Sequence, residues 1–278
     1  MFNVIRMELH RMFRTRSFYI TLAVNVILIV LLFSMMASSI NEGFAAAKNS
    51  VRQNVEGLEM EMILDNRYGP NPMNVCFSFT GWSILFVVIF MACFVGRFYK
   101  DGFCKNVMGS RGYRFRFQMA QSVCAVLYSA VNIILAGTVS LLMAKALIQS
   151  FTFAYLDIFC LNLFGQFLLL CAVGSFSAFL TEWTRSTVPA IVYIFLLSTN
   201  IVAMMTSYID SHLSDWLHKE FVTANYLPSL YFTNQFLLDV SDSAKNNAML
   251  LHATLLSLVF FVIYNVAGSA LITKRDIK

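Results

Sequence analysis

The sequence predicts an all-α integral membrane protein with six transmembrane helices. The 278 residues are 58% hydrophobic and only 13% charged, and their mean hydropathy is +0.68. Soluble domains carry about 25% charged residues, so much of the apolar surface here must face lipid. Apolar runs of about 18 residues or more, the length at which a helix spans a bilayer, recur six times. They lie at 18–38, 76–96, 119–143, 157–180, 188–207 and 251–272.

The apolar runs are expected to be helices, because no backbone N–H or C=O group can stay unpaired in lipid. None of them alternates apolar and polar residues as the strands of a barrel do. The chain has no internal repeat and no Pro-rich or Ser-rich linker, so we expect one membrane domain, 1–278. The first run lacks a convincing cleavage site and is expected to remain in the mature protein.

The basic residues predict the orientation of the spans. The two termini and the loops 97–118 and 181–187 hold 14 of the 20 Lys and Arg residues, which places these segments in the cytoplasm. The loops 39–75, 144–157 and 208–250 are then outside, and they hold 11 of the 15 acidic residues. The net charge of +5 therefore indicates orientation in a membrane, and no nucleic-acid motif is present.

Residues 1–17 show the pattern of an amphipathic helix at the inner membrane surface. The apolar residues recur at steps of three or four and are Phe2, Ile5, Leu9, Met12 and Phe13. The basic residues take another face or flank the first span, and they are Arg6, His10, Arg11, Arg14 and Arg16. We expect an elbow that turns into the first span at Ser17. A simpler interpretation is that some of these arginines only fix the topology.

The cytoplasmic loop 97–118 mixes apolar and charged residues and then reaches a turn at Gly109–Gly112. A short helix closed by glycine fits this pattern. Asp101 and Lys105, four residues apart, would form a pair worth only ~0.2–0.5 kcal/mol if the helix were merely structural. Tyr113–Arg116 combines aromatic and basic residues and suits the membrane interface.

At these positions the chain resembles the single-domain membrane subunits of type-2 ABC exporters. ELHRMFRTRSFY, from Glu8, looks like the amphipathic start of that family. FYKDGFCKN, from Phe98, looks like its acidic-Gly-x-x-Lys-Asn loop, and the basic ending Thr273–Lys278 is similar to its usual C-terminus. With six spans in the same order, the resemblance covers the whole chain.

The resemblance implies a coupling helix that docks in a separate ATPase and transmits its closure to the spans. The residues concerned are Tyr99, Lys100, Asp101, Gly102, Lys105 and Asn106. Two copies of that cytoplasmic ATPase would bind ATP and Mg, and a second permease copy, identical or paired, would complete the transporter. The expected location is a bacterial cell membrane, with several spans and both termini in the cytoplasm.

Several functions are disfavoured by missing residues. No G-x-x-x-x-G-K-[ST] phosphate loop occurs, and no ionisable group lies at the centre of a predicted span, which argues against ion coupling. His252 has no acidic neighbour, and no cysteine within the spans has a His at helical spacing, so we expect neither catalysis nor a bound cofactor or metal. Asn25 and Asn200 are candidates for a polar substrate path, although such residues more often bridge neighbouring helices.

The outer loops carry two further helical patterns. Phe44, Val51, Val55, Leu58 and Met62 recur at heptad-like steps, which predicts a helix that covers the spans or lies on the outer leaflet. In the second loop, a zinc site is conceivable from four residues, Asp210, His212, Asp215 and His218. The opposite face of the same helix is apolar, which favours an interfacial helix instead; its residues are Ile209, Leu213, Trp216 and Leu217. In the resembling family the segment before the last span often re-enters the membrane as short helices, which Pro228 would allow.

The resemblance implies the permease subunit of an ATP-driven exporter, and the missing catalytic patterns predict that the chain is not itself an enzyme. The 27 Phe and 15 Met residues, the uncharged spans and the acidic outer side favour amphipathic or hydrophobic peptides as substrate, for export or for self-protection against antimicrobial peptides. An exporter of a lipid-linked or small hydrophobic compound is the alternative, as is a non-transport scaffold or sensor.

Overall fold

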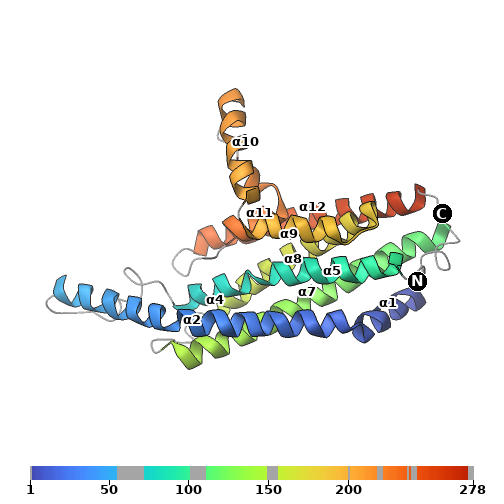
Figure 1. Cartoon of the computed structure of the whole chain (residues 1–278). Helices are drawn as coiled ribbons and strands as arrows, with labels where there is room; N and C mark the ends of the chain where they lie inside the picture. The colour runs from blue at the N-terminus through green and yellow to red at the C-terminus, as the bar shows by residue number, and fades with distance from the viewer. Residues whose placement is uncertain are drawn as a thin grey trace.

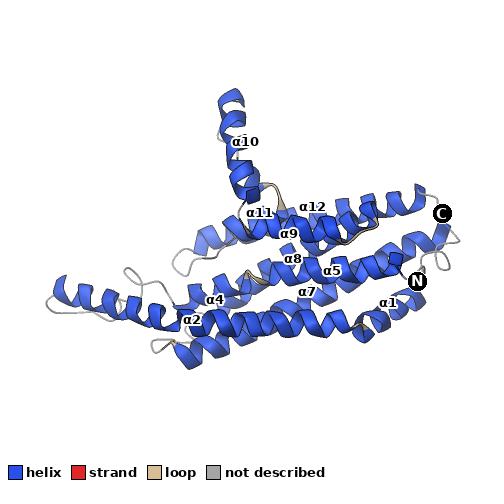
Figure 2. Cartoon of the chain, viewed as in Figure 1, coloured by secondary structure: helices blue, strands red, loops and turns tan. Residues whose placement is uncertain are grey.

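The computed structural model is a bundle of long helices, and the described residues contain no strand (Figure 2). The structure describes residues 2–54, 72–100, 111–148, 156–199, 201–217, 222–236, 238 and 243–274.

Five helical stretches in the described residues are long and apolar enough to cross a membrane. They are Arg16–Ala37, Cys76–Lys100, Arg114–Leu147, Leu156–Thr184 and Lys245–Thr273. They belong to α2 (Arg16–Asn54), α4 (Pro72–Thr80) with α5 (Ser83–Lys100), α7 (Arg111–Leu147), α8 (Leu156–Thr184) and α12 (Ser243–Lys274). The prediction of a helical chain with several apolar helices of membrane-spanning length is therefore confirmed.

The predicted fifth span at 188–207 is not one continuous helix in the structure. The structure has α9 (Val188–Ser198) followed by α10 (Ile201–Leu217), bent by 73° at the break. The hydroxyl groups of Ser198 and Thr199 hydrogen-bond back to the carbonyl of Phe195, which competes with the helical ladder and favours a bend. The described residues thus contain five stretches long and apolar enough to span a membrane, or six if the bent pair counts as one span.

Other helix boundaries also differ from the predicted ones. The predicted turn at Gly109–Gly112 extends too far, because its last two residues, Arg111 and Gly112, already belong to α7. The expected loop 181–187 is shorter, since α8 continues to Thr184 and is followed by Arg185 in the left-handed region, at φ 54°. The first span continues without a break into the predicted outer loop as far as Asn54. Such continuation costs little, because the residues beyond the membrane can keep their helical hydrogen bonds in water.

The two ends of the chain lie at the same end of the bundle (Figure 1). There, α1 (Phe2–Arg14) packs mainly on α7 and is separated from α2 by Thr15. We call this region the basic end: it comprises α1, the end of α5, the start of α7 and the ends of α8 and α12. Predicted orientation places it in the cytoplasm.

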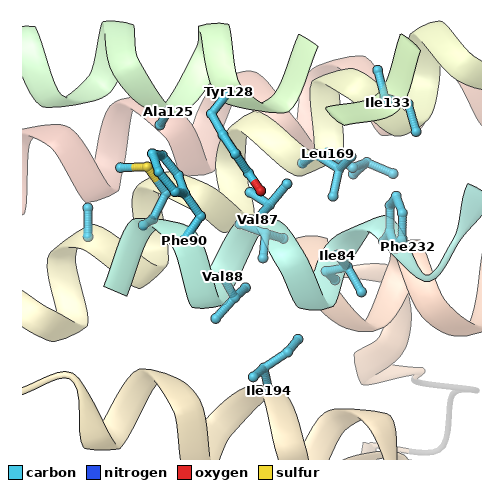
Figure 3. Packing of buried hydrophobic residues seen from close by; sticks show 14 of the residues in the cluster. Ile84, Val87, Val88, Phe90, Ala125, Tyr128, Ile133, Leu169, Ile194 and Phe232 are labelled. Atoms are coloured by element: carbon cyan, nitrogen blue, oxygen red, sulfur yellow. The ribbon is translucent and has the colours of Figure 1, made fainter. Parts of the chain in front are cut away.

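The core lies where α5, α7 and α8 meet, and α5 is the most buried of the spans. The Tyr128 ring stacks on the Phe90 ring with 3.8 Å between centroids, and its hydroxyl donates to Thr21 Oγ1 at 2.7 Å. Phe18 meets both rings edge-on and so joins α2 to this centre. Figure 3 shows Tyr128 and Phe90 turned toward one another, with Val87 beside them. Helices α5, α7 and α8 therefore contribute to both the core and the basic end.

The segment before α12 consists of short helical turns that are largely buried. They are η1 (Thr223–Asn225), α11 (Pro228–Leu230) and η2 (Tyr231–Gln235). They pack on α8 and α12, and the ring of Phe236 occupies the space that a side chain at Gly165 would need. His252 of α12 lies 2.8 Å from the Asn225 carbonyl. Pro228 therefore begins a short helix inside the bundle, as the sequence allowed.

Candidate functional site at the basic end

The predicted coupling residues follow directly from α5. Tyr99 and Lys100 form its last turn, with Tyr99 half-buried and Lys100 exposed. Asp101, Gly102, Lys105 and Asn106 lie outside the described residues. Because α5 ends at Lys100 and α7 begins at Arg111, both arms of the loop leave from the basic end (Figure 1).

An aromatic contact joins the two arms. The rings of Phe98 in α5 and Phe117 in α7 stack at 4.2 Å, and both side chains are buried. Ile272 near the end of α12 completes this small cluster, against which Tyr99 packs. Arg114 Nη1 donates to the carbonyl oxygens of Ile272 and Thr273 at 3.2 and 3.3 Å, where the last carbonyls of a helix lack partners. Displacement of either arm of the loop would therefore also displace the end of α12.

A largely buried ion pair lies within α1 at the same end of the bundle. Glu8 has no exposed surface, and its Oε2 lies 2.7 Å from Arg11 Nη2. The Arg11 guanidinium also lies over the rings of Phe94 and Phe98, at 4.4 and 5.4 Å from their centroids. Burial raises the pKa of Glu8 to about 7, and the Arg11 charge opposes this rise. An amphipathic helix is thereby docked through a charge on its inner face.

The buried face of α1 differs from the one predicted for residues 1–17. Arg6, His10, Arg14 and Arg16 are exposed, but Arg11 turns inward. Phe13, expected on the apolar face, is 48% exposed. The buried face runs instead through Val4, Glu8 and Met12 at steps of four. That spacing was visible in the sequence, but a glutamate in the row obscured it.

A second buried carboxyl group lies between the ends of three helices. With its amide oriented so that nitrogen faces the carboxylate, Gln118 of α7 donates to Glu182 of α8 at 2.6 and 3.1 Å. Both side chains are buried, at 2% and 4% exposure. A Cβ on Gly268 of α12 would lie 2.7 Å from the other terminal atom of the Gln118 amide, its oxygen in this orientation, and 2.8 Å from Glu182 Oε2. Glycine therefore allows α12 to approach this polar pair. Sequence reasoning missed Glu182 because it placed this residue in a loop.

The predicted path residue Asn25 lies inside the bundle. Its Nδ2 donates to Asn132 Oδ1 at 2.6 Å, and neither side chain has exposed surface. This contact bridges α2 and α7, as does the bond from Tyr128 to Thr21 one turn away. Asn200 lies outside the described residues. A role for Asn25 in substrate movement stays a prediction.

The residues considered for zinc are not gathered into a site in the part of the chain that the structure describes. Asp210 accepts hydrogen bonds from the backbone N–H of Thr223, at 3.0 Å to each carboxylate oxygen, and from the Thr223 hydroxyl. The His212 ring meets Tyr208 edge-on at 4.6 Å. These contacts give Asp210 a structural partner.

The contacts at the basic end join helices that are far apart in the sequence. α1, both arms of the loop and the ends of α8 and α12 are joined there through side chains that the structure buries. No protein-family model matches the chain, and no curated protein is significantly similar to it.

Proposed function

We propose that this chain is the permease subunit of an ATP-driven ABC exporter, coupled to its ATPase through residues 99–106. The loop between α5 and α7 leaves from the junction at which Phe98, Phe117 and Ile272 meet. This is the single observation that supports the proposal best. A loop docked on a moving partner needs arms that move with the spans, and packed side chains transmit such rigid-body motion.

The proposed unit contains two such chains and two ATPase subunits that bind ATP and Mg. One side of the bundle carries exposed apolar residues along α2, and another carries them along α12. Lipid or a second permease can cover either side. The proposed cargo is an amphipathic or hydrophobic peptide, since the predicted spans contain no charged residue at their centres.

The first experiment is co-purification in detergent with the ATPase encoded beside this chain. The test variant carries Asp101→Ala, Lys105→Ala and Asn106→Ala. A matched control carries Arg52→Ala, Asn54→Ala and Glu56→Ala, which likewise remove one basic, one amide and one acidic side chain, from the segment after the first span. We expect the native chain and the control to retain the ATPase and the test variant, equally stable to heat, to lose it.

Two other results would overturn the proposal. If the test variant retains the ATPase as well as the native chain does, coupling does not use residues 101–106. If the native chain never binds an ATPase, a scaffold or sensor function replaces the exporter. Cargo is tested separately, by whether cells that express both subunits survive an amphipathic cationic peptide at higher concentrations than cells whose ATPase cannot hydrolyse ATP.

A further inference from the structure

The helix α10 leaves the bundle (Figure 1). One of its faces carries a stripe of exposed apolar side chains. The stripe comprises side chains that are 40–71% exposed: Ile201 40%, Met204 71%, Met205 61%, Tyr208 69% and Ile209 53%. The last four lie three, four, seven and eight residues after Ile201, which is the spacing of one helix face. Water is a poor environment for such a face, so something else must cover it.

The polar face of α10 is turned the other way and is tied to the protein. Asp210 stands opposite the centre of the stripe on the helix and accepts the three hydrogen bonds from Thr223 in η1. Thr206 bonds only to the backbone of its own helix. The helix therefore offers its apolar side outward while a carboxylate on its other side fixes it to the chain.

The stripe continues an apolar surface that begins on α9. The exposed face of α9 comprises Val188, Ile191, Val192 and Phe195, again at steps of three, four and seven. An 11-residue helix is about 16 Å long, roughly half the hydrocarbon thickness of a bilayer. The chain then bends by 73°. A helix bent so far from a span lies close to the plane of the membrane.

We propose that α10 is an interfacial helix embedded in the leaflet farther from the basic end, with Ile201, Met204, Met205 and Tyr208 in contact with lipid. Lipid is favoured over a second copy of the chain because the exposed apolar side chains of α10 follow directly after those of α9, an apolar helix of half a membrane span. Tyr208 suits this depth, since tyrosine is enriched where acyl chains meet headgroups. Methionine packs without a fixed shape against disordered chains. This inference is independent of the proposed exporter function.

A consequence is that the α10 helix fixes the depth of the buried turns that follow it. Asp210 and Thr223 connect the interfacial helix to η1, and the Asn225 carbonyl in η1 meets His252 of α12. Lipid contact on α10 is thus connected through two hydrogen-bonded steps to the last span.

The test is a depth profile by spin labelling in phosphatidylcholine proteoliposomes. Single cysteines at each position from 201 to 212 are introduced into a variant without native cysteines, and the relative access of oxygen and a polar nickel complex is measured. For an interfacial helix, the oxygen-to-nickel ratio oscillates with a period of 3.6 residues about a constant mean. We expect it to be at least several-fold higher at 204, 205 and 208 than at the control positions 203 and 207.

Two outcomes would overturn this inference. A ratio that changes steadily along the helix, as depth does by about 1.5 Å per residue in an upright span, would show that α9 and α10 cross the bilayer together. Labels at 204, 205 and 208 that are immobilised, excluded from oxygen and broadened by labels on another molecule would show a second copy at the stripe. Should the cysteine-free chain not fold, a genetically encoded ketone amino acid carries the label in the native background.

A substitution tests the anchor. Asp210→Ala removes the bonds to Thr223, so the 3.6-residue oscillation should lose amplitude as the helix tilts or rotates. Ser211→Ala is the matched control, because the exposed Ser211 hydroxyl bonds only to its own helix. Equal profiles for the two variants would contradict the anchoring role of Asp210.

Discussion

The Glu8 carboxylate and the Arg11 guanidinium form an ion pair of 2.7 Å on the buried side of α1. Taking either charge out of water is unfavourable, and each makes the burial of the other tolerable. Because Arg11 also lies over Phe94 and Phe98 of α5, the pair is part of the contact by which the N-terminal helix meets that span. We therefore expect the docking of α1 to depend partly on both residues.

Removing one residue of the Glu8–Arg11 pair should destabilise the chain. Arg11→Ala leaves the Glu8 carboxyl buried without its counter-charge, and losses of about 3–5 kcal/mol are typical when a buried pair is broken in this way. Glu8→Gln should be milder, since a neutral amide fills the same space. The measurement is the unfolding midpoint of each variant in detergent. Arg14→Ala, at an exposed position of the same helix, is the control and should change the midpoint little.

The pH dependence of stability should reveal the same carboxyl group. The pKa of Glu8 is about 7 in the folded chain against 4.5 in the unfolded chain, so the folded state holds more protons between these values. The free energy of unfolding should therefore fall as pH rises from 4.5 to 7, by up to ~3 kcal/mol, and level off above. Subtracting the profile of Glu8→Gln isolates this group. A difference that grows with pH would contradict the raised pKa.

Enlarging Gly268 should separate α12 from the polar pair of α7 and α8. A methyl group there would press on Gln118 and Glu182, and overpacking of this kind costs about 1–3 kcal/mol. Gly268→Ala should therefore lower the unfolding midpoint although alanine favours helices. Ala270→Ser, at an exposed position two residues away, is the comparison. If Gly268→Ala is as stable as the native chain, the close approach of the three helices is not required.

The contact between Asn25 and Asn132 can be measured by a double-mutant cycle. Asn25→Leu, Asn132→Leu and the double variant should show a coupling free energy near 0.6 kcal/mol and no more than about 1.7 kcal/mol, the range known for hydrogen bonds between membrane helices. SDS-induced unfolding provides the measurement. Zero coupling would mean that the two amides do not bond, and Asn25 would again be available to a substrate path.

Apolar run length was enough to locate most spans from the sequence. The runs at 18–38, 119–143 and 251–272 each lie inside one long helix, because lipid leaves a continuous apolar segment no other hydrogen-bonded state. The run at 188–207 is just as apolar, yet it bends where Ser198 and Thr199 redirect their hydroxyls to Phe195. Hydropathy measures transfer into lipid and is insensitive to such local competition for the backbone.

The sequence by itself determined that this chain is helical and has several helices long and apolar enough to cross a membrane, since composition and run length decide which solvent the chain can face. The tertiary structure alone decided which polar groups are buried together. Glu8 and Arg11 are neighbours on one helix, but only the approach of α5 makes that face an interior. Gln118, Glu182 and Gly268 are far apart in sequence, and only the packing of three helices brings them into contact, because burial is a property of neighbours in space.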